Sequence, residues 1–481
     1  MATATYRFIV PGRYIGQTVT VFDQATNAQV ASGAVGSDGV YSVALTQGDY
    51  YATTPDGRYV DADSQGASSS DAANAAQAAL SATFARPRLL TAVVAGDSIA
   101  AHDAEGSSAT YAKGTNAGGF YAVANALLGC PLLFTANGAV SGERTDQTLA
   151  RMDTVLASNP GYLFLHAGVN DVIQNIPAAT IQANITAILD KARAAGTFVV
   201  VDTILPSNAA TAPQADVRRA VNLWLINTVQ RTRRDVAVFD GNRYVADPTT
   251  SGPSWVGAFT SDGLHPNAAG GFQLGLPLAD LLATLLPKGQ PVNTHTSDPT
   301  NLLTKGIPQG TAGQKDASVT GSVADAWAIW KATGTGAVTA SVVARTDGVQ
   351  GSVSRAVITA GNTGLYYFQQ QIAPPAAGTI IYGEIEANLP GDWTTPKRLY
   401  ASLEVYNGGT LLADAYSLRQ VTADVAIPKN IARQGMKFRM PAVAVPSGAT
   451  AVQLKLFFQA DSGTIDLTGG AIRTASAVGP I

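Results

Sequence analysis

The sequence has little of several things that define whole classes of protein. It holds one cysteine and four histidines in 481 residues, and only 14% of its residues are charged. One cysteine excludes an intramolecular disulfide. The histidines show no paired metal-ligand spacing, so we expect no metal and no other cofactor. The net charge of −3 gives no electrostatic reason to expect nucleic acid or an anionic membrane as a partner.

Long apolar runs are missing as well. No segment approaches the 18 continuous apolar residues typical of a transmembrane helix, so no membrane insertion is expected. The start, MATATYRFIVPGRY, lacks the charged segment and apolar run of a signal peptide. If the protein works outside a cell, it does not leave by an obvious secretory signal. Cys130 lies in the apolar run ALLGCPLLF, which predicts a buried and unreactive thiol.

The two ends of the chain carry β patterns. Residues 1–66 alternate between β-rich segments and turns, and resemble small prealbumin-like β-sandwiches. Residues 67–87 are rich in alanine and predict a helix, either a linker or part of a bundle between identical chains, such as a homotrimer. Residues 291–315 are rich in proline, glycine and threonine and predict a linker. Residues 316–481 predict a β-sandwich, a jelly roll resembling carbohydrate-binding modules.

Residues 88–290 have a different pattern. Apolar runs such as LLTAVVA, YLFLHAG and TFVVVDTIL alternate with helical patterns such as DQTLARMDTVLAS. Buried strands that alternate with helices predict a parallel sheet covered on both faces, which is a three-layer α/β domain. In such sheets the reactive groups collect at the carboxyl ends of the strands.

Four short motifs fall at the ends of elements in this domain. Ser98 ends the turn GDS after the first strand, Gly142 lies in NGAVSGERT, and Asn170 lies in GVND. The last motif, SDGLHPNAAG, contains Asp262 and His265. Together and in this order they resemble the GDSL or SGNH hydrolase family. The resemblance implies a flavodoxin-like sheet and hydrolysis of esters through an acyl-enzyme.

The chemistry of these residue types agrees with the resemblance. A serine hydroxyl is a poor nucleophile and needs a base, which His265 can provide. Asp262, three residues earlier, can meet the same imidazole in a tight loop and stabilise the imidazolium. The resemblance further implies an oxyanion hole made of the Ser98 N–H, the Gly142 N–H and the Asn170 side-chain amide.

Other residues compete for these roles. Asp97 is expected to brace its loop, and Asp171 to orient Asn170 and its loop. His166 sits inside a strand and is expected to be a satisfied core histidine. His102, four residues after Ser98, is expected to point away from it, with a place in the substrate pocket as the alternative. Gly138 is the rival of Gly142 as oxyanion donor.

The predicted function is a serine esterase that removes O-acetyl groups from a surface polysaccharide. Six aromatic side chains of the last domain could stack on sugars or belong to the core: Trp327, Trp330, Trp393, Tyr366, Tyr367 and Phe368. The domain order resembles bacteriophage tail proteins, so the protein is expected outside the cell or on a virion, its first domain docked to tail proteins. A bacterial surface esterase is the competitor. The alternative function is a tail receptor-binding protein whose hydrolase domain is idle.

Overall fold

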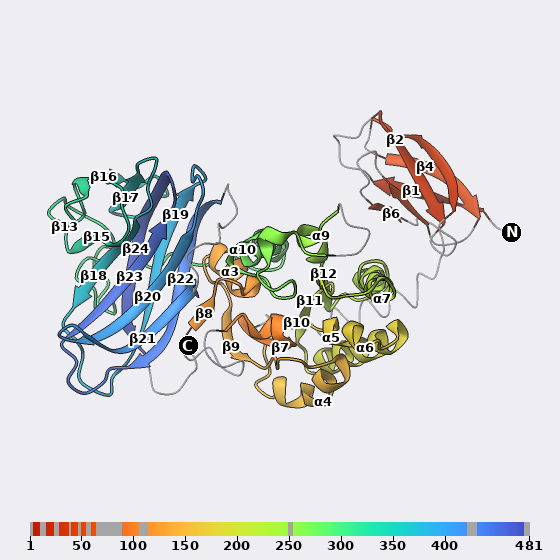
Figure 1. Ribbon diagram of the computed structural model, residues 1–481, viewed down its shortest axis with the longest axis horizontal. Coiled ribbons are helices and arrows are strands. Elements are labelled where there is room, and N and C mark those ends of the chain that lie inside the picture. The colour runs from red at the N-terminus through yellow and green to blue at the C-terminus, as the bar shows by residue number, and fades with distance from the viewer. Residues whose placement is uncertain are drawn as a thin grey trace. The chain divides into compact units, whose positions relative to one another are not determined.

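The computed structural model describes residues 3–9, 16–23, 28–37, 40–46, 50–53, 59–63, 89–104, 114–248, 254–420 and 431–475. The chain divides into two compact units, Met1–Arg86 and Pro87–Ile481, and each is described by itself. The alanine-rich helix predicted at residues 67–87 lies outside the described residues. The multidomain layout, a parallel α/β sheet with β-rich parts on either side in the sequence, is confirmed (Figure 1).

The first unit is a six-stranded antiparallel sheet in the order β3-β2-β5-β6-β1-β4. Its strands are β1 Thr3–Ile9, β2 Thr18–Asp23, β3 Gln29–Ala34, β4 Val40–Thr46, β5 Tyr50–Thr53 and β6 Tyr59–Asp63. The edge strands β3 and β4 contact each other, and a small core packs against the sheet. Phe8, Val19, Val21 and Tyr50 fill that core.

The second unit contains a five-stranded parallel sheet in the order β12-β11-β10-β7-β9. The strands are β7 Thr91–Gly96, β9 Leu133–Asn137, β10 Tyr162–His166, β11 Phe198–Asp202 and β12 Val236–Phe239. β10, β11 and β12 are buried along their whole length, as their near-continuous apolar sequences predict. Because the chain order reverses between β7 and β10, the carboxyl ends of these two strands border the crevice where ligands bind in open α/β sheets.

Helices cover both faces of this sheet, with α3 and α10 packed together on one face and α4, α6 and α7 on the other (Figure 1). The longer helices are α3 Phe120–Leu127, α4 Thr145–Val155, α6 Ala178–Ala194, α7 Ala212–Trp224 and α10 Ala268–Leu282. The short ones are α2 Ser98–Ala101, α5 Val169–Ile173, η2 Leu225–Val229, α8 Gln230–Thr232, α9 Asn242–Val245 and η3 Gly257–Phe259. Among the described residues, no helix combines the length and apolarity needed to cross a bilayer.

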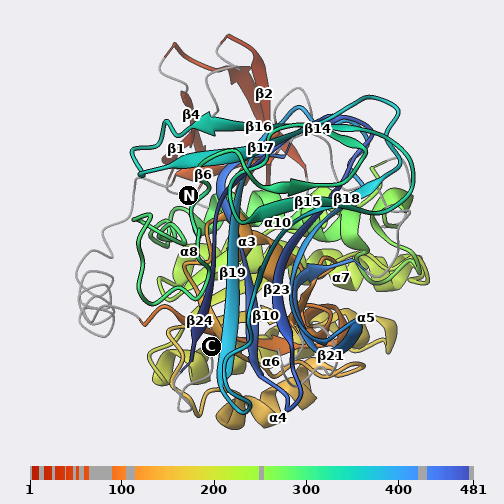
Figure 2. The same ribbon diagram turned by 90° about the vertical axis from the view of Figure 1, so that its left-hand side faces the viewer.

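The last part of the chain forms two packed sheets. The first has the order β13-β15-β18-β23-β20-β21-β8, and the second has the order β14-β16-β17-β24-β19-β22 (Figure 2). The strands are β8 Gly114–Asn116, β13 Gln314–Lys315, β14 Val319–Gly321, β15 Trp327–Thr333, β16 Val338–Ala344, β17 Ser352–Ile358, β18 Leu365–Ile372, β19 Ile380–Pro390, β20 Arg398–Asn407, β21 Thr410–Arg419, β22 Ala432–Ala444, β23 Ala451–Gln459 and β24 Gly463–Thr474. In β23, Val452, Leu454, Leu456 and Phe458 are all fully buried and belong to the core.

Most of the aromatic residues considered for sugar stacking belong to the core of this sandwich. Trp327, Trp393, Tyr366 and Phe368 are all buried, so stacking on a sugar is wrong for these four. Trp327 donates its indole N–H to the Lys305 carbonyl at 2.8 Å, which satisfies its one polar atom inside the protein. Only Trp330 and Tyr367 of the six are partly exposed.

A strand from the α/β part completes the edge of the first sheet. β8 runs parallel to β21, with Gly114 paired to Tyr416 and Asn116 to Arg419. A β-carbon on Gly114 would lie 1.8 Å from the Tyr416 carbonyl oxygen, so the close approach requires glycine. The α/β part and the sandwich therefore share a sheet as well as one continuous core.

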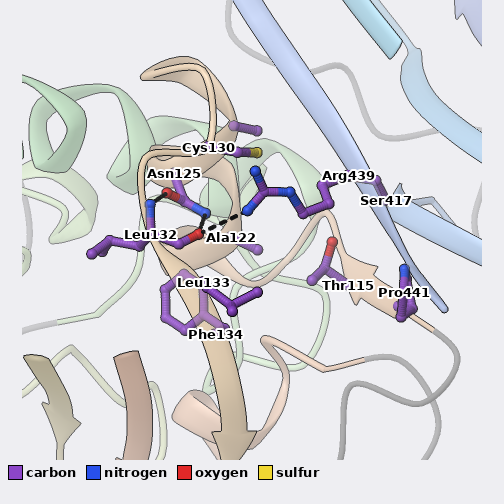
Figure 3. A pocket seen from close by; sticks show the side chains of 12 residues that line it. Thr115, Ala122, Asn125, Cys130, Leu132, Leu133, Phe134, Ser417, Arg439 and Pro441 are labelled. Atoms are coloured by element: carbon purple, nitrogen blue, oxygen red, sulfur yellow. Dashed lines mark hydrogen bonds between the residues drawn. The ribbon is translucent and has the colours of Figure 1, made fainter. Parts of the chain in front are cut away.

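Cys130 lies in the seam between these two parts, beside a cavity of about 60 Å³ (Figure 3). Its thiol donates to the Lys437 carbonyl at 3.2 Å, and Arg439 reaches across to the Leu132 carbonyl at 3.4 Å. Burial raises the pKa of the Cys130 thiol, which keeps it protonated and unreactive. The predicted buried thiol is confirmed, and it contributes to the seam.

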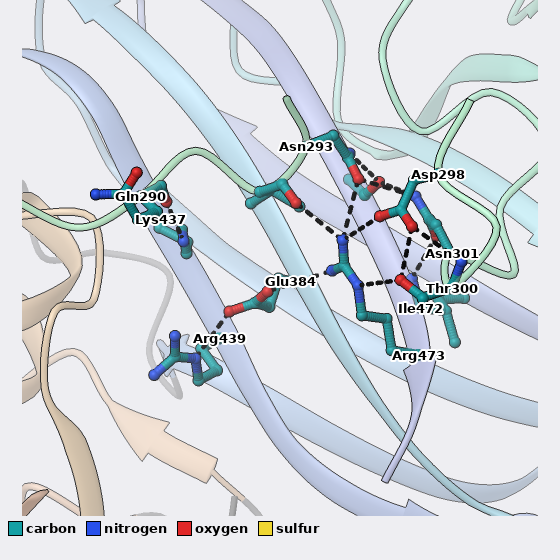
Figure 4. A network of polar contacts seen from close by, with 12 residues as sticks. Gln290, Asn293, Asp298, Thr300, Asn301, Glu384, Lys437, Arg439, Ile472 and Arg473 are labelled. Carbon is teal, nitrogen blue, oxygen red and sulfur yellow. Dashed lines mark hydrogen bonds and ion pairs between the residues drawn. The ribbon is translucent and has the colours of Figure 1, made fainter. Parts of the chain in front are cut away.

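Residues 291–315 lie against the second sheet of the sandwich (Figure 4). The guanidinium of Arg473 donates to Asp298 at 2.7 Å, to Asn293 at 3.2 Å and to the Val292 carbonyl at 3.0 Å. Hydrogen bonds from Thr300, together with Arg473, lower the pKa of Asp298 to about 2. The segment predicted to be a linker is thus tied to β24 by a charged network.

Candidate active site

Ser98 is the first residue of α2, directly after the turn that ends β7. The turn is tight because Gly96 has a φ of 131°, and a β-carbon there would lie 1.7 Å from the His166 carbonyl oxygen. Asp97 caps the helix, its Oδ1 accepting from the Ile99 N–H at 3.0 Å. This confirms the bracing role expected of Asp97. The Ser98 N–H, in the first turn of a helix, has no intrahelical acceptor.

His265 meets Ser98 from the loop before α10. Its Nε2 lies 2.8 Å from Ser98 Oγ, and its Nδ1 lies 2.7 Å from Asp262 Oδ2. The loop is shaped by Asp262 itself, whose Oδ1 accepts from the N–H groups of Leu264 at 2.9 Å and His265 at 2.8 Å. Gly263, with a φ of 78°, permits the turn between them. The three residues predicted to act together therefore form one hydrogen-bonded chain.

The electrostatics of this chain favour an ionised Asp262. Partial burial acts to raise its pKa, but the hydrogen bonds from His265 and from two backbone N–H groups hold that pKa well below its usual range. The carboxylate is thus available to accept from His265 Nδ1 at neutral pH, which leaves Nε2 facing Ser98 as the acceptor. The site is open, since the Asp262 side chain is 53% exposed and that of His265 is 21% exposed.

The loop with Gly142 is fixed close to Ser98. The Val140 N–H donates to the Gly96 carbonyl at 2.9 Å, two residues before the serine. Gly142 itself lies exposed in the turn with a φ of 83°. Its rival Gly138 donates its N–H to the Val94 carbonyl at 2.8 Å and is engaged in the sheet. The geometry therefore favours Gly142 as the available backbone donor.

Asn170 stands beside the same loop. It lies in α5, which follows β10, and its side-chain Nδ2 donates to the Glu143 carbonyl at 2.9 Å. Asp171 anchors this short helix, because its carboxylate accepts from the Thr145 N–H at 2.8 Å and the Thr145 hydroxyl at 2.6 Å. The orienting role expected of Asp171 is thus visible as a tie between α5 and the start of α4.

Sequence reasoning missed the side chain that clamps the Gly142 loop. Arg151 of α4 forms an ion pair with Glu143 at 2.6 Å and also donates to the Gly138 carbonyl at 2.9 Å. It therefore holds both ends of the turn that carries Gly142. Arg151 lies in the helix that follows this loop, and no local sequence pattern relates it to Gly142.

A buried polar cluster lies under the Ser98 turn. His166 is fully buried, and its Nδ1 lies 3.1 Å from Asp202 Oδ2, which also accepts from the Tyr121 hydroxyl at 2.5 Å. His166 Nε2 and Asp97 Oδ2 have no hydrogen-bond partner among the described residues. Burial raises the pKa of Asp97, against the opposing charge of His166. His166 is a core residue as predicted, but only one of its ring nitrogens is satisfied.

The expectation for His102 was wrong. Its ring stacks on that of His265, with centroids 4.5 Å apart and planes inclined by 19°. Residues four apart lie on the same side of a helix. His102 is four residues after Ser98, so its side chain lies on the side of the helix that faces the site. The described residues contain no group of His, Cys, Asp and Glu side chains that could hold a metal ion.

The fold and this array define the class: a three-layer α/β domain with a serine, a histidine and an aspartate in hydrogen-bonded series. Residues 94–271 match the model of the GDSL-like Lipase/Acylhydrolase family. This match supports an ester-hydrolase domain, as the four motifs predict. No protein with a curated description matches the sequence.

Several solved structures resemble part of the chain. A lipolytic protein of the G-D-S-L family from Desulfitobacterium hafniense is 18% identical, over 40% of this chain and 99% of its own, with a TM-score of 0.33. Axe2, an acetyl-xylooligosaccharide esterase from Geobacillus Stearmophilus solved as a mutant, is 17% identical over 42% and 96%, with a TM-score of 0.33. The enzymatically active domain of tailspike protein 4 of Bacteriophage CBA120 is 17% identical over 31% and 20%, with a TM-score of 0.25.

Asn170→Ala tests the oxyanion geometry. Loss of one preorganised donor is expected to lower kcat for p-nitrophenyl acetate by about 10²- to 10³-fold while KM changes little, because the donor acts on the developing charge. Gln174→Ala, at the exposed end of the same helix, is the matched control and should stay within about twofold of the parent. Equal rates for both variants would exclude Asn170 from the oxyanion hole.

Proposed function

We propose that this protein is a serine esterase that works through an acyl-enzyme on Ser98. The observation that carries the proposal is the continuous chain from Asp262 through His265 to Ser98 Oγ, with contacts of 2.7 and 2.8 Å. Both distances lie within the hydrogen-bond reach that a nucleophile, its base and an orienting carboxylate require. No step in this chemistry requires a metal ion or another cofactor.

The reaction follows from this arrangement. His265 Nε2 takes the proton of Ser98 as Oγ bonds to the ester carbonyl carbon, and the imidazolium is stabilised by Asp262. The oxyanion accepts hydrogen bonds from the Ser98 N–H, the Gly142 N–H and Asn170 Nδ2. The tetrahedral intermediate then breaks its bond to the alcohol, which leaves with the proton of His265. Water repeats the sequence on the acyl-enzyme, releasing the carboxylic acid and restoring Ser98.

The substrate we propose is an O-acetylated polysaccharide. One support is the open site, because an ester carried on a polymer must reach Ser98 without the chain entering a deep pocket. The other support is a row of aromatic side chains on the outer face of the seven-stranded sheet. Trp330, Tyr367, Phe457 and Tyr400 are paired in register across β15, β18, β23 and β20.

These rings form a continuous surface. The centroids of Tyr400 and Phe457 are 4.5 Å apart with planes inclined by 6°, and those of Tyr367 and Phe457 are 5.0 Å apart. The core of the sandwich lies on the opposite face of this sheet, so packing of the core does not require the row. Trp330, Tyr367 and Tyr400 are partly exposed.

Polar side chains form the next rows of the same face. Gln369, Lys455, Ser402 and Tyr416 are paired in register beside the aromatic row. Lys455 forms an ion pair with Glu404 at 2.5 Å, and its ammonium lies 5.3 Å from the Tyr367 ring centroid. An apolar stripe flanked by donors and acceptors suits a sugar chain, which has apolar ring faces and hydroxyl edges.

The location we propose is outside the cell, on a bacteriophage virion. The order of the parts supports it: a small β-domain suited to docking on other tail proteins, then the hydrolase, then a sandwich that binds glycan. A homotrimer built on the alanine-rich segment fits the same proposal. A tail receptor-binding protein with an idle hydrolase domain is the second candidate, and a bacterial surface esterase is the competing source.

Ser98→Ala separates an active enzyme from an idle domain. We expect acetate release from O-acetylated polysaccharides, and hydrolysis of p-nitrophenyl acetate, to fall by about 10⁴-fold or more, because the variant has no nucleophile. Ser322→Ala, an exposed serine of the sandwich, is the control and should keep full activity. If the Ser98→Ala rate equals that of the parent protein, the serine mechanism is wrong.

Tyr367→Ala and Tyr400→Ala test the glycan-binding face. Each is expected to weaken retention in affinity electrophoresis on gels containing acetylated xylan or acetylated bacterial capsular polysaccharides by about tenfold, the loss of one aromatic contact. Hydrolysis of p-nitrophenyl acetate should not change. Val357→Ala, an exposed apolar residue of the other sheet, is the control. Unaltered retention of both tyrosine variants, or no retention of the parent on any of these gels, would refute the role of this face.

A further inference from the structure

His102 is a titratable side chain that stacks on the candidate general base, His265. It is the C-cap of α2, the single helical turn that begins at Ser98, and its N–H donates to the Ser98 carbonyl at 3.1 Å. One turn of helix therefore connects the nucleophile to a ring that lies over the face of His265, 4.5 Å between centroids. The edges of the His265 ring are already occupied by Ser98 and Asp262.

We propose that His102 is a positioning residue for His265 and makes the site sensitive to pH. This rests on the esterase function proposed above. Three contacts then hold the His265 ring in place. Asp262 and Ser98 fix its two nitrogens, and His102 fixes the plane of the ring. A neutral imidazole over that plane also presents its π-face to the positive charge that His265 gains when it takes the proton of Ser98.

The protonation state of His102 decides whether it stabilises or destabilises the His265 imidazolium. Neutral His102 stabilises the His265 imidazolium, whereas protonated His102 places a second positive charge against it. Burial lowers the pKa of His102, the charge of His265 lowers it further, and Asp262 opposes both. His102 therefore stays neutral at neutral pH and accepts a proton only in acid.

Among the described residues, the charged groups that bear on His102 from the facing loop are His265 and Asp262. The two acids of its own turn are directed elsewhere, since Asp97 accepts from the Ile99 N–H and Asp103 from the Ala122 N–H of α3. Acid therefore acts on His102 where its ring lies over His265.

The pH profile of hydrolysis tests this inference. The substrate is p-nitrophenyl acetate, and log kcat/KM is plotted against pH. For the parent protein, the slope of the acid limb should rise from about one toward about two as the pH falls, because both rings must be neutral in the active form. His102→Phe keeps a stacked ring but cannot be protonated. Its acid limb should keep a slope of about one, with a rate at pH 8 within about threefold of the parent. His102→Ala loses the stack and should fall about tenfold at pH 8.

An NMR titration of the imidazole groups supplies a readout that needs no activity. In the parent protein the His102 ring signals should titrate with a pKa below the usual range for histidine. Full activity of His102→Ala with a parental acid limb, or a His102 ring that titrates within or above the usual range, would overturn the inference. Should the protein hydrolyse no ester while the pKa of His102 is lowered, the esterase function fails and the contact between the rings stands.

Discussion

The hydrogen bond between Ser98 Oγ and His265 Nε2 is the contact on which the account of this protein depends. It joins residues 167 positions apart, one at the end of the first strand of the parallel sheet and one just before its last helix. Local contacts at both ends of this bond bring the two residues together. Gly96 lets β7 approach β10, Asp97 starts α2 at the serine, and Asp262 folds its own loop so that it holds the histidine it orients.

Three arginines tie together parts of the second unit. Arg151 holds the Gly142 loop, Arg473 ties residues 292–300 to β24, and Arg439 spans the seam beside Cys130. Elsewhere, small residues permit close packing, as at Gly114 between β8 and β21. The α/β part and the sandwich are consequently one compact unit.

Much of the α/β fold and of the candidate site could be predicted from the sequence, for a physical reason. The strands around Ser98 are buried on both faces, so their sequences are almost entirely apolar. Parallel strands also bring their carboxyl ends to one edge of the sheet. Motifs at those ends therefore meet, and the residue types of Ser98 and His265 suit a nucleophile and its base. The family resemblance was needed for Asn170 and for Gly142, and Gly138 carries the same local signal as Gly142. Only the structure shows that the Gly138 N–H is already engaged.

Other features have no local signal. Gly114–Asn116 is too short to show strand periodicity, and its pairing with β21 depends on contacts about 300 residues apart in sequence. Residues 291–315 have the composition of a linker, yet single side chains such as Asn293 and Asn301 bind them to Gly470. His102 was misjudged because its place on the helix was considered without the loop that approaches it from residue 265.

The most direct measurement is covalent labelling of the protein with diisopropyl fluorophosphate, followed by peptide mass spectrometry. An activated serine displaces fluoride and keeps the phosphoryl group, so the account predicts a single label, on the peptide containing Ser98. It also predicts that His265→Ala is labelled at a small fraction of the parent rate, because Ser98 Oγ has lost its base. Labelling of another residue, or equal labelling of the parent protein and His265→Ala, would contradict the account.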